Sequence, residues 1–234
     1  MASNQHLLLI PGLVCDAAVW RHQVAHLGDI AKIIVPPVTH GETIDEMART
    51  VLDAAPQEFA LAGFSMGGYI ALEIFRQAPE RITRLALLDT SARADTPKKT
   101  AWRQEVLCAC ERGEYPSVIE GMMPVLLHPD HQHGSLPSFV REMAARVGTE
   151  TYVRRQFAIG GRQDSRELLR AATQPVRAIC GREDGMSTID EHVEIAELAQ
   201  RGRFSIIEQC GHMTILEQPQ AATALLRDWL LYDT

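Results

Sequence analysis

The stretch Gly63-Phe64-Ser65-Met66-Gly67-Gly68 decides how this chain folds, because it places a serine between two different structural patterns. Residues 59–63 (FALAG) form a short apolar run typical of a buried strand, and residues 67–77 have the periodicity of a helix. The pattern G-x-S-x-G between a strand and a helix is typical of a nucleophile on a sharp turn. A serine there can instead cap the helix. The strand–turn–helix context favours the nucleophile.

The glycines around Ser65 have a steric reason. A serine that projects from so tight a turn must adopt a strained backbone conformation. Residues two positions away on either side then collide unless they lack a Cβ atom, which Gly63 and Gly67 do. We expect Gly68 to allow the following helix to pack closely on the sheet.

Composition limits the class of protein. The 234 residues fit one domain, and 46% hydrophobic with 23% charged residues is ordinary for a globular chain. The 23 basic and 30 acidic side chains give a net charge of −7, which argues against a nucleic-acid partner. No apolar run approaches the about 18 residues of a membrane helix, and the N-terminus lacks the features of a signal peptide. We therefore expect a cytoplasmic protein whose five cysteines are reduced, with no bound metal.

Short apolar runs alternate with helical patterns, which predicts an α/β fold with a mostly parallel sheet covered by helices on both faces. Each expected strand is followed by a helix or a polar loop. The expected strands are 6–10, 31–36, 59–63, 82–89, 176–181 and 203–208, and the expected helices between them are 20–27, 44–55, 67–77, 190–199 and 219–231.

One interval breaks this alternation. Residues 91–173 contain no clear strand, and their length is too great for a loop in a compact domain. Their patterns predict helices at 100–112, 115–123, 136–147, 150–158 and 165–172. We therefore expect residues 1–90 and 174–234 to form the core and residues 91–173, the helical insertion, to cover it.

A serine nucleophile needs a base and a group that orients the base. His212 follows the last expected strand in a Gly-His turn, so it is the expected base. Asp184, on the polar loop after the strand at 176–181, is the expected acid because that loop faces the histidine loop. The adjacent Glu183, and Asp89 at the end of an earlier strand, remain alternatives.

Four segments together resemble the α/β-hydrolase superfamily in its small bacterial form, and the resemblance covers essentially the whole chain. They are IPGLVCDAAVW at 10–20, GFSMGGYIALE at 63–73, CGREDGMS at 180–187 and CGHMTILEQP at 210–219. Within that superfamily, the chain is similar to the branch that contains carrier-protein methyl ester carboxylesterases and related small ester hydrolases. The resemblance implies an α/β-hydrolase fold of about six parallel strands with a helical lid. It also implies an oxyanion hole formed by the backbone N–H groups of Leu13 and Met66.

The chain departs from the family at Pro11-Gly12, where many relatives have His-Gly. That histidine usually braces the oxyanion loop, so the resemblance does not indicate which residue supports this loop in the present chain.

The expected function is a serine hydrolase of small to medium carboxylic esters or thioesters, which forms an acyl-enzyme and needs no cofactor. The expected partner is the small-molecule substrate; no nucleic acid or membrane is expected, and the oligomeric state is open. Two alternatives remain: hydrolysis or elimination at a carbon–carbon bond with the same triad, and an inactive ligand-binding module.

Other residues carry weaker signals. The run 122–127 (MMPVLL) can line an acyl pocket or pack inside the insertion. His128, His131 and His133 resemble a metal site only superficially. Two cysteines, near the oxyanion loop and the histidine loop, can react with thiol reagents, and four arginines of the insertion can bind a substrate anion or lie on a solvated face. These are Cys15, Cys210, Arg154, Arg155, Arg162 and Arg166.

Overall fold

The computed structural model describes residues 5–233, which form a six-stranded sheet with all strands parallel and the order β2-β1-β3-β4-β5-β6. This arrangement confirms the predicted fold class. Strands β3 and β5 are buried along their full length, as expected where helices cover both faces. The strands are β1 (His6–Ile10), β2 (Lys32–Ile34), β3 (Phe59–Phe64), β4 (Ile82–Leu88), β5 (Val176–Gly181) and β6 (Gly202–Ile207).

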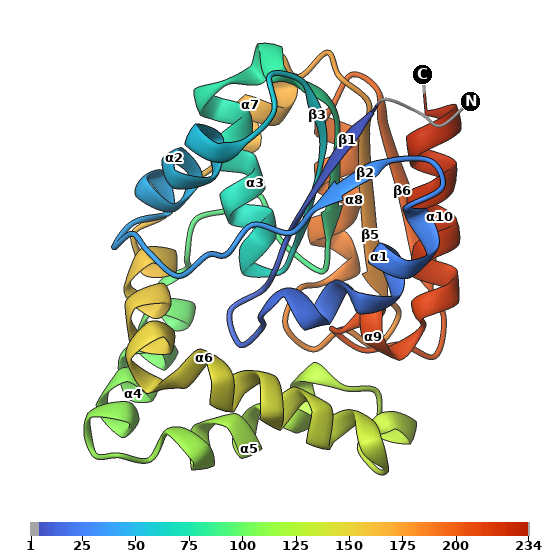
Figure 1. Ribbon diagram of the computed structural model, residues 1–234. Helices are drawn as coiled ribbons and strands as arrows, with labels where there is room; N and C mark the ends of the chain where they lie inside the picture. Colours follow the sequence, from blue (N-terminus) through green and yellow to red (C-terminus); the bar gives the residue numbers. More distant parts are fainter. Residues whose placement is uncertain (1–4, 234) are drawn as a thin grey trace.

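Alternate side chains of each strand enter two separate apolar clusters. In β1, Leu7 and Leu9 pack into the cluster that includes residues of α1 and α10, whereas Leu8 and Ile10 face α2, α3 and α8. The sheet therefore lies between two layers of helices (Figure 1). These helices are α1 (Arg21–Leu27), α2 (Ile44–Ala54), α3 (Met66–Gln77), α8 (Ile189–Leu198) and α10 (Pro219–Tyr232). Each begins and ends within one residue of its expected position.

The helical insertion leaves the sheet after β4 and returns at β5. Its helices are α4 (Pro97–Glu111), α5 (Tyr115–Leu126), α6 (Ser135–Gly160) and α7 (Arg166–Ala171). Helices α4, α5 and α6 lie beyond the carboxyl ends of the strands (Figure 1), whereas α7 packs against α8. Gly148, with φ of 74°, interrupts α6 between the two helices, 136–147 and 150–158, that the sequence predicts.

Hydrogen bonds connect the insertion to the loop that carries His212 and to the helix that follows it. The backbone N–H of His212 donates to the carbonyl of Leu126 at 3.0 Å, and Glu217 of α9 (Thr214–Glu217) accepts a bond from the His128 N–H at 2.7 Å. A Cβ on Gly211 would lie 2.6 Å from the His128 nitrogen, so only glycine allows this approach. No helix within residues 5–233 is long and apolar enough to cross a membrane.

Candidate active site

Ser65 stands on a strained turn between β3 and α3. Its φ of 54° and ψ of −118° lie in a region that L-residues rarely adopt. A Cβ on Gly63 would lie 2.2 Å from the Gly67 carbonyl oxygen, and one on Gly67 would lie 2.2 Å from the Ile10 oxygen. A Cβ on Gly68 would meet the Thr90 side chain at 2.5 Å. The three glycines therefore make room for the turn, as their positions in the sequence predict.

The Ser65 hydroxyl is directed toward a histidine. Ser65 occupies the N-cap position of α3, but its side chain makes no capping hydrogen bond. Its Oγ lies 2.9 Å from Nε2 of His212 instead. The interpretation of Ser65 as a helix cap does not fit this geometry.

His212 is in turn held by a carboxylate. Its Nδ1 lies 2.9 and 3.0 Å from the two carboxylate oxygens of Asp184. Asp184 also accepts bonds from the N–H groups of Met186 and Ser187 at 2.7 and 3.0 Å, and from the Ser187 hydroxyl at 2.6 Å. A carboxylate with this many donors is fixed in orientation, and it selects the tautomer in which His212 carries its proton on Nδ1.

The alternative acids lie elsewhere. Glu183 is partly exposed and accepts a bond from the backbone of Cys210 at 3.0 Å. Asp89 is fully buried and bonds to the Thr214 hydroxyl at 2.5 Å and to the Gly181 N–H at 3.3 Å. Neither makes a hydrogen bond to His212 in the described part of the chain.

The environments of the two buried carboxyls shift their pKa values in opposite directions. Burial opposes ionisation of Asp184, but His212 and the Ser187 donors outweigh it and hold the pKa of Asp184 below its ordinary value. Burial, followed by the charge of Asp184, raises the pKa of Asp89 well above its ordinary value. The site therefore favours the ionised form of Asp184, the carboxylate that contacts the histidine.

The expected oxyanion donors lie at the ends of two strands beside Ser65. Leu13 follows β1, and Met66 is the first residue of α3, where backbone N–H groups have no intrahelical acceptor. Within residues 5–233, neither of these N–H groups donates a hydrogen bond. The loop that contains Leu13 is close to the serine, because a Cβ on Gly12 would lie 3.3 Å from the Ser65 Cβ.

A cavity of about 700 Å³ opens at Ser65 and His212, between the strand ends and helices α4 and α5. Apolar side chains of α4 and α5 form much of its wall, and charged residues of α4 also line it. A site of this volume accommodates a small organic molecule. Lining residues include Tyr69, Lys98, Trp102, Val106, Val118, Met122, Val125 and Met186.

Comparison with known proteins identifies the family of this chain. Residues 7–225 match the family described as the alpha/beta hydrolase family. The chain belongs to that family. The hydrogen-bonded serine, histidine and aspartate at the strand ends thus lie in a hydrolase scaffold.

Three relatives illustrate what this hydrolase resembles. It is 23% identical over 235 residues to the pimeloyl-[acyl-carrier protein] methyl ester esterase of Nitrosomonas europaea, with 92% of this chain and 91% of the relative covered. It is 25% identical over 207 residues to the putative carbamate hydrolase RutD of Cronobacter turicensis, covering 85% and 75%. The solved structure of a thermophilic esterase from Thermogutta terrifontis, with malate bound, is similar with a TM-score of 0.90 and 28% identity, covering 100% and 92%.

Two cysteines near the site of this hydrolase are shielded from solvent. Cys15 and Cys210 are buried, at 1% and 0% exposure. Burial raises the pKa of Cys15 to about 12 and also raises that of Cys210, which disfavours the reactive thiolate. Reaction of these cysteines with thiol reagents stays a prediction.

His128 and His131 of the insertion contact the segment that follows His212, whereas His133 is exposed. His131 Nδ1 lies 2.9 Å from a carboxylate oxygen of Glu217, the same oxygen that accepts from the His128 backbone. No group of three or more potential metal ligands is clustered anywhere within residues 5–233.

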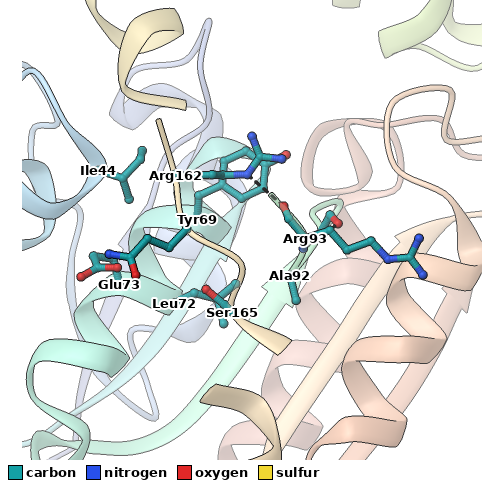
Figure 2. Close-up of a pocket in the computed structure, with 10 residues that line it drawn as sticks. Ile44, Tyr69, Leu72, Glu73, Ala92, Arg93, Arg162 and Ser165 are labelled. Atoms are coloured by element: carbon teal, nitrogen blue, oxygen red, sulfur yellow. Dashed lines mark hydrogen bonds between the residues drawn. The ribbon is translucent and has the colours of Figure 1, made fainter. Parts of the chain in front are cut away.

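Arg154, Arg155, Arg162 and Arg166 do not form one solvated face. Arg166 is half-buried and pairs with Asp164, whereas Arg155 and Arg162 are buried. Arg162 lies over the Tyr69 ring, 4.1 Å from its centroid, and its Nε donates to the Arg93 carbonyl at 3.1 Å (Figure 2). Its Nη1 pairs with Asp95 at 2.5 Å. The adjoining void of about 10 Å³ has room for one water molecule.

The run 122–127 is shared between the cavity and the apolar packing. Met122 and Val125 line the cavity at Ser65, and Met122 also belongs, with Met123, Leu126 and Leu127, to the apolar cluster. Alternation around the helix explains the division.

Two residues that hold Ser65 in place, Thr90 and His192, are not among those that the sequence predicts. The Thr90 hydroxyl donates to the Ser65 carbonyl at 2.8 Å, and the Thr90 N–H donates to Nε2 of the buried His192 at 2.9 Å. Thr90 lies two residues beyond the end of β4, and this position is a usable signal, since side chains at strand ends meet the site. The sequence contains no such signal for His192, because a histidine inside α8 resembles any other residue of a helix.

Proposed function

We propose that this chain is a serine hydrolase that cleaves carboxylic esters and thioesters through Ser65, His212 and Asp184. The observation that carries the proposal is the continuous hydrogen-bonded series from Ser65 Oγ through the imidazole to Asp184, beside a largely apolar cavity. The names of the relatives, two esterases and a putative carbamate hydrolase, support hydrolysis at an acyl carbon.

In the proposed first step, Ser65 Oγ attacks the carbonyl carbon while His212 Nε2 accepts its proton. Asp184 stabilises the imidazolium, and its low pKa keeps it ionised for this role. The carbonyl oxygen becomes an oxyanion, which accepts hydrogen bonds from the Leu13 and Met66 N–H groups; each such donor is worth about 3 kcal/mol of the barrier. Collapse of the tetrahedral intermediate expels the alcohol or thiol, which takes the proton from His212.

The acyl group is then an ester of Ser65. Water, deprotonated by His212, attacks it through a second tetrahedral intermediate, and the acid leaves with Ser65 restored. The helical insertion acts as a lid in this proposal, and its α4 and α5 side chains contact the acyl group.

Replacing the proposed nucleophile tests the function. Ser65→Ala should abolish turnover of p-nitrophenyl butyrate and labelling by a fluorophosphonate, leaving the circular dichroism spectrum unchanged. Parental protein should release a burst of p-nitrophenol equal to its active-site concentration and then turn over. Labelling or turnover that persists in Ser65→Ala contradicts the assignment of the nucleophile. Ligand-induced stabilisation of the parental protein without turnover supports a binding module instead.

A further inference from the structure

Arg155 is a buried cation of the insertion that contacts the core. It lies in the part of α6 that follows the break at Gly148, and it is 2% exposed. Within residues 5–233, no carboxylate lies within ion-pair distance of its guanidinium. Its donors bond to backbone carbonyls instead, and the acceptors are Gly12 (3.4 Å), Leu13 (2.6 Å), Cys15 (3.1 Å) and Val38 (2.8 and 3.1 Å).

Three of these four acceptors belong to the loop after β1. A buried guanidinium without a counter-charge is costly to desolvate, and burial lowers the pKa of Arg155. Such a group is held in place only if its donors are well satisfied, and its planar fork then fixes the acceptors it reaches. The carbonyls of Gly12, Leu13 and Cys15 converge on one nitrogen, Nη1, so the loop is folded around this side chain.

The contact with Gly12 bears directly on the Leu13 N–H. The Gly12 carbonyl and the Leu13 N–H belong to one planar trans peptide, in which they point in opposite directions. The Gly12 oxygen accepts from Arg155 and also from the Cys15 N–H at 3.2 Å. Because the oxygen is held toward Arg155, the Leu13 N–H is held away from it and stays available to a substrate oxygen.

We propose that Arg155 is a positioning residue of the oxyanion hole, which orients the Gly12–Leu13 peptide for the tetrahedral intermediate; this inference rests on the proposed function. The insertion thereby contributes to the chemistry as well as to the substrate cavity. The oxyanion loop then depends on α6, although Arg155 follows Cys15 by 140 residues in the chain.

The test compares Arg155 with its neighbour. Arg155→Met keeps the length of the side chain but removes all five donors, and Arg155→Lys keeps the charge and one nitrogen. Arg154→Met is the control, because Arg154 lies on the same turn of α6 and bonds to the Thr39 carbonyl at 3.0 Å without contacting the loop after β1. Circular dichroism and thermal unfolding establish that each variant is folded.

We expect Arg155→Met to lower kcat for p-nitrophenyl butyrate by about 10²-fold with KM within about threefold of parental, as for loss of an oxyanion donor. Arg155→Lys should lose about tenfold, since one nitrogen still reaches the carbonyls. Arg154→Met should stay within about twofold. A trifluoromethyl ketone, which forms an oxyanion on Ser65, should bind Arg155→Met more weakly by the same factor as kcat, whereas butyrate binding should change little.

Rescue separates positioning from a structural role. Methylguanidine should restore part of the kcat of Arg155→Ala, and methylamine should restore less, because only the guanidinium supplies the planar fork. If Arg155→Met does not fold, Arg155→Lys decides the question with the same measurements.

Two results would overturn the inference. Folded Arg155 variants whose kcat and ketone affinity match Arg154→Met would remove the positioning role while leaving the proposed function intact. Parental protein that neither turns over esters nor labels at Ser65 would overturn the proposed function, and the inference with it.

Discussion

Two buried carboxyls at the carboxyl edge of the sheet show how residue environment separates similar side chains. Asp184 accepts bonds from Met186, Ser187 and His212, and its pKa is lowered. Asp89 has φ of 50° and bonds to Thr214, and its pKa is raised by burial and by the charge of Asp184. The environment thus keeps one carboxyl charged and favours the neutral form of the other.

Asp184→Asn should lower kcat by about 10⁴-fold, because an amide presents a donor to His212 and favours the wrong tautomer. Asp89→Asn should cost less than about tenfold in kcat, since the neutral amide replaces a carboxyl that burial already biases toward neutrality. The measurement is kcat for p-nitrophenyl butyrate in both folded variants. The reverse ranking would assign the acid to the end of β4.

At the residue scale, the sequence was sufficient where local pattern and chain order act together. The G-x-S-x-G turn and the order serine, aspartate, histidine named three residues that hydrogen bonds join in the structure. Arg155 could not be found in this way. Its acceptors lie 117 to 143 residues away, and a buried arginine has the same local sequence pattern as a solvated one.

At the scale of elements, α8 supports the nucleophile through a series of hydrogen bonds. His192 Nδ1 donates to the Thr188 carbonyl at 2.8 Å, and Nε2 accepts from the Thr90 N–H at 2.9 Å. The Thr90 hydroxyl in turn holds the Ser65 carbonyl at 2.8 Å. One ring nitrogen donates and the other accepts, so His192 must be neutral in the folded protein.

This neutral histidine makes stability depend on pH. Burial lowers the pKa of His192 from 6.5, although Thr188 and the charge of Asp184 oppose the shift. Below pH 6.5 the unfolded chain therefore binds a proton that the folded chain does not, and the free energy of unfolding falls as pH decreases. This histidine should contribute a slope of at most about 1.4 kcal/mol per pH unit, measured by urea unfolding between pH 7 and pH 5.

His192→Phe supplies the comparison. It should be less stable than parental at pH 7 by about 1–3 kcal/mol, because the Thr90 N–H loses its acceptor. Its stability should nevertheless fall less steeply on acidification. His133→Asn, which replaces an exposed histidine, serves as the control and should retain the parental slope. Equal slopes in all three proteins would show that His192 does not cause the acid sensitivity.

The elements themselves were largely predictable, and the exceptions have physical causes. Strong apolar periodicity located β1 to β6 and the sheet helices to within two residues at each end. The short α9 and the 3₁₀ turn Ala17–Trp20 were not predicted, because four residues are too few to show a period. Their positions depend on contacts across the fold: Asp16 at the start of the turn, for example, is paired with Arg146 of α6.

At the scale of the whole molecule, the two parts of the chain have different tasks in the proposed function. The strand ends carry Ser65, Asp184 and His212, and the helical insertion supplies most of the cavity wall through α4 and α5. The insertion is connected to the core by the Arg155 bonds to the loop after β1, by Arg162 over the Tyr69 ring, and by the Leu126–His212 bond. Sequence predicted that an insertion exists but not which of its side chains face the cavity, since that depends on how the helices pack.

Substrate preference should therefore change with the insertion and not with the strand ends. Met122 and Met123 both belong to the apolar cluster and are nearly equally buried, at 5% and 6% exposed, but only Met122 also lines the cavity. Met122→Ala and Met123→Ala should each destabilise the fold by about 2–5 kcal/mol, because both leave a void. Only Met122→Ala enlarges the substrate cavity, so it alone should shift the preferred p-nitrophenyl ester toward longer acyl chains.

The size of this shift follows from the apolar contact that one methylene makes. Each added CH₂ that fits the enlarged cavity contributes about 0.8 kcal/mol, so kcat/KM for an ester one or two carbons longer should rise about 4- to 15-fold relative to butyrate. The measurement is kcat/KM across acetate, butyrate, hexanoate and octanoate esters, with fluorophosphonate labelling of Ser65 as the check on the triad. An identical chain-length profile in both methionine variants would contradict the role of α5 in acyl recognition, because Met123→Ala reproduces the loss of stability without opening the cavity.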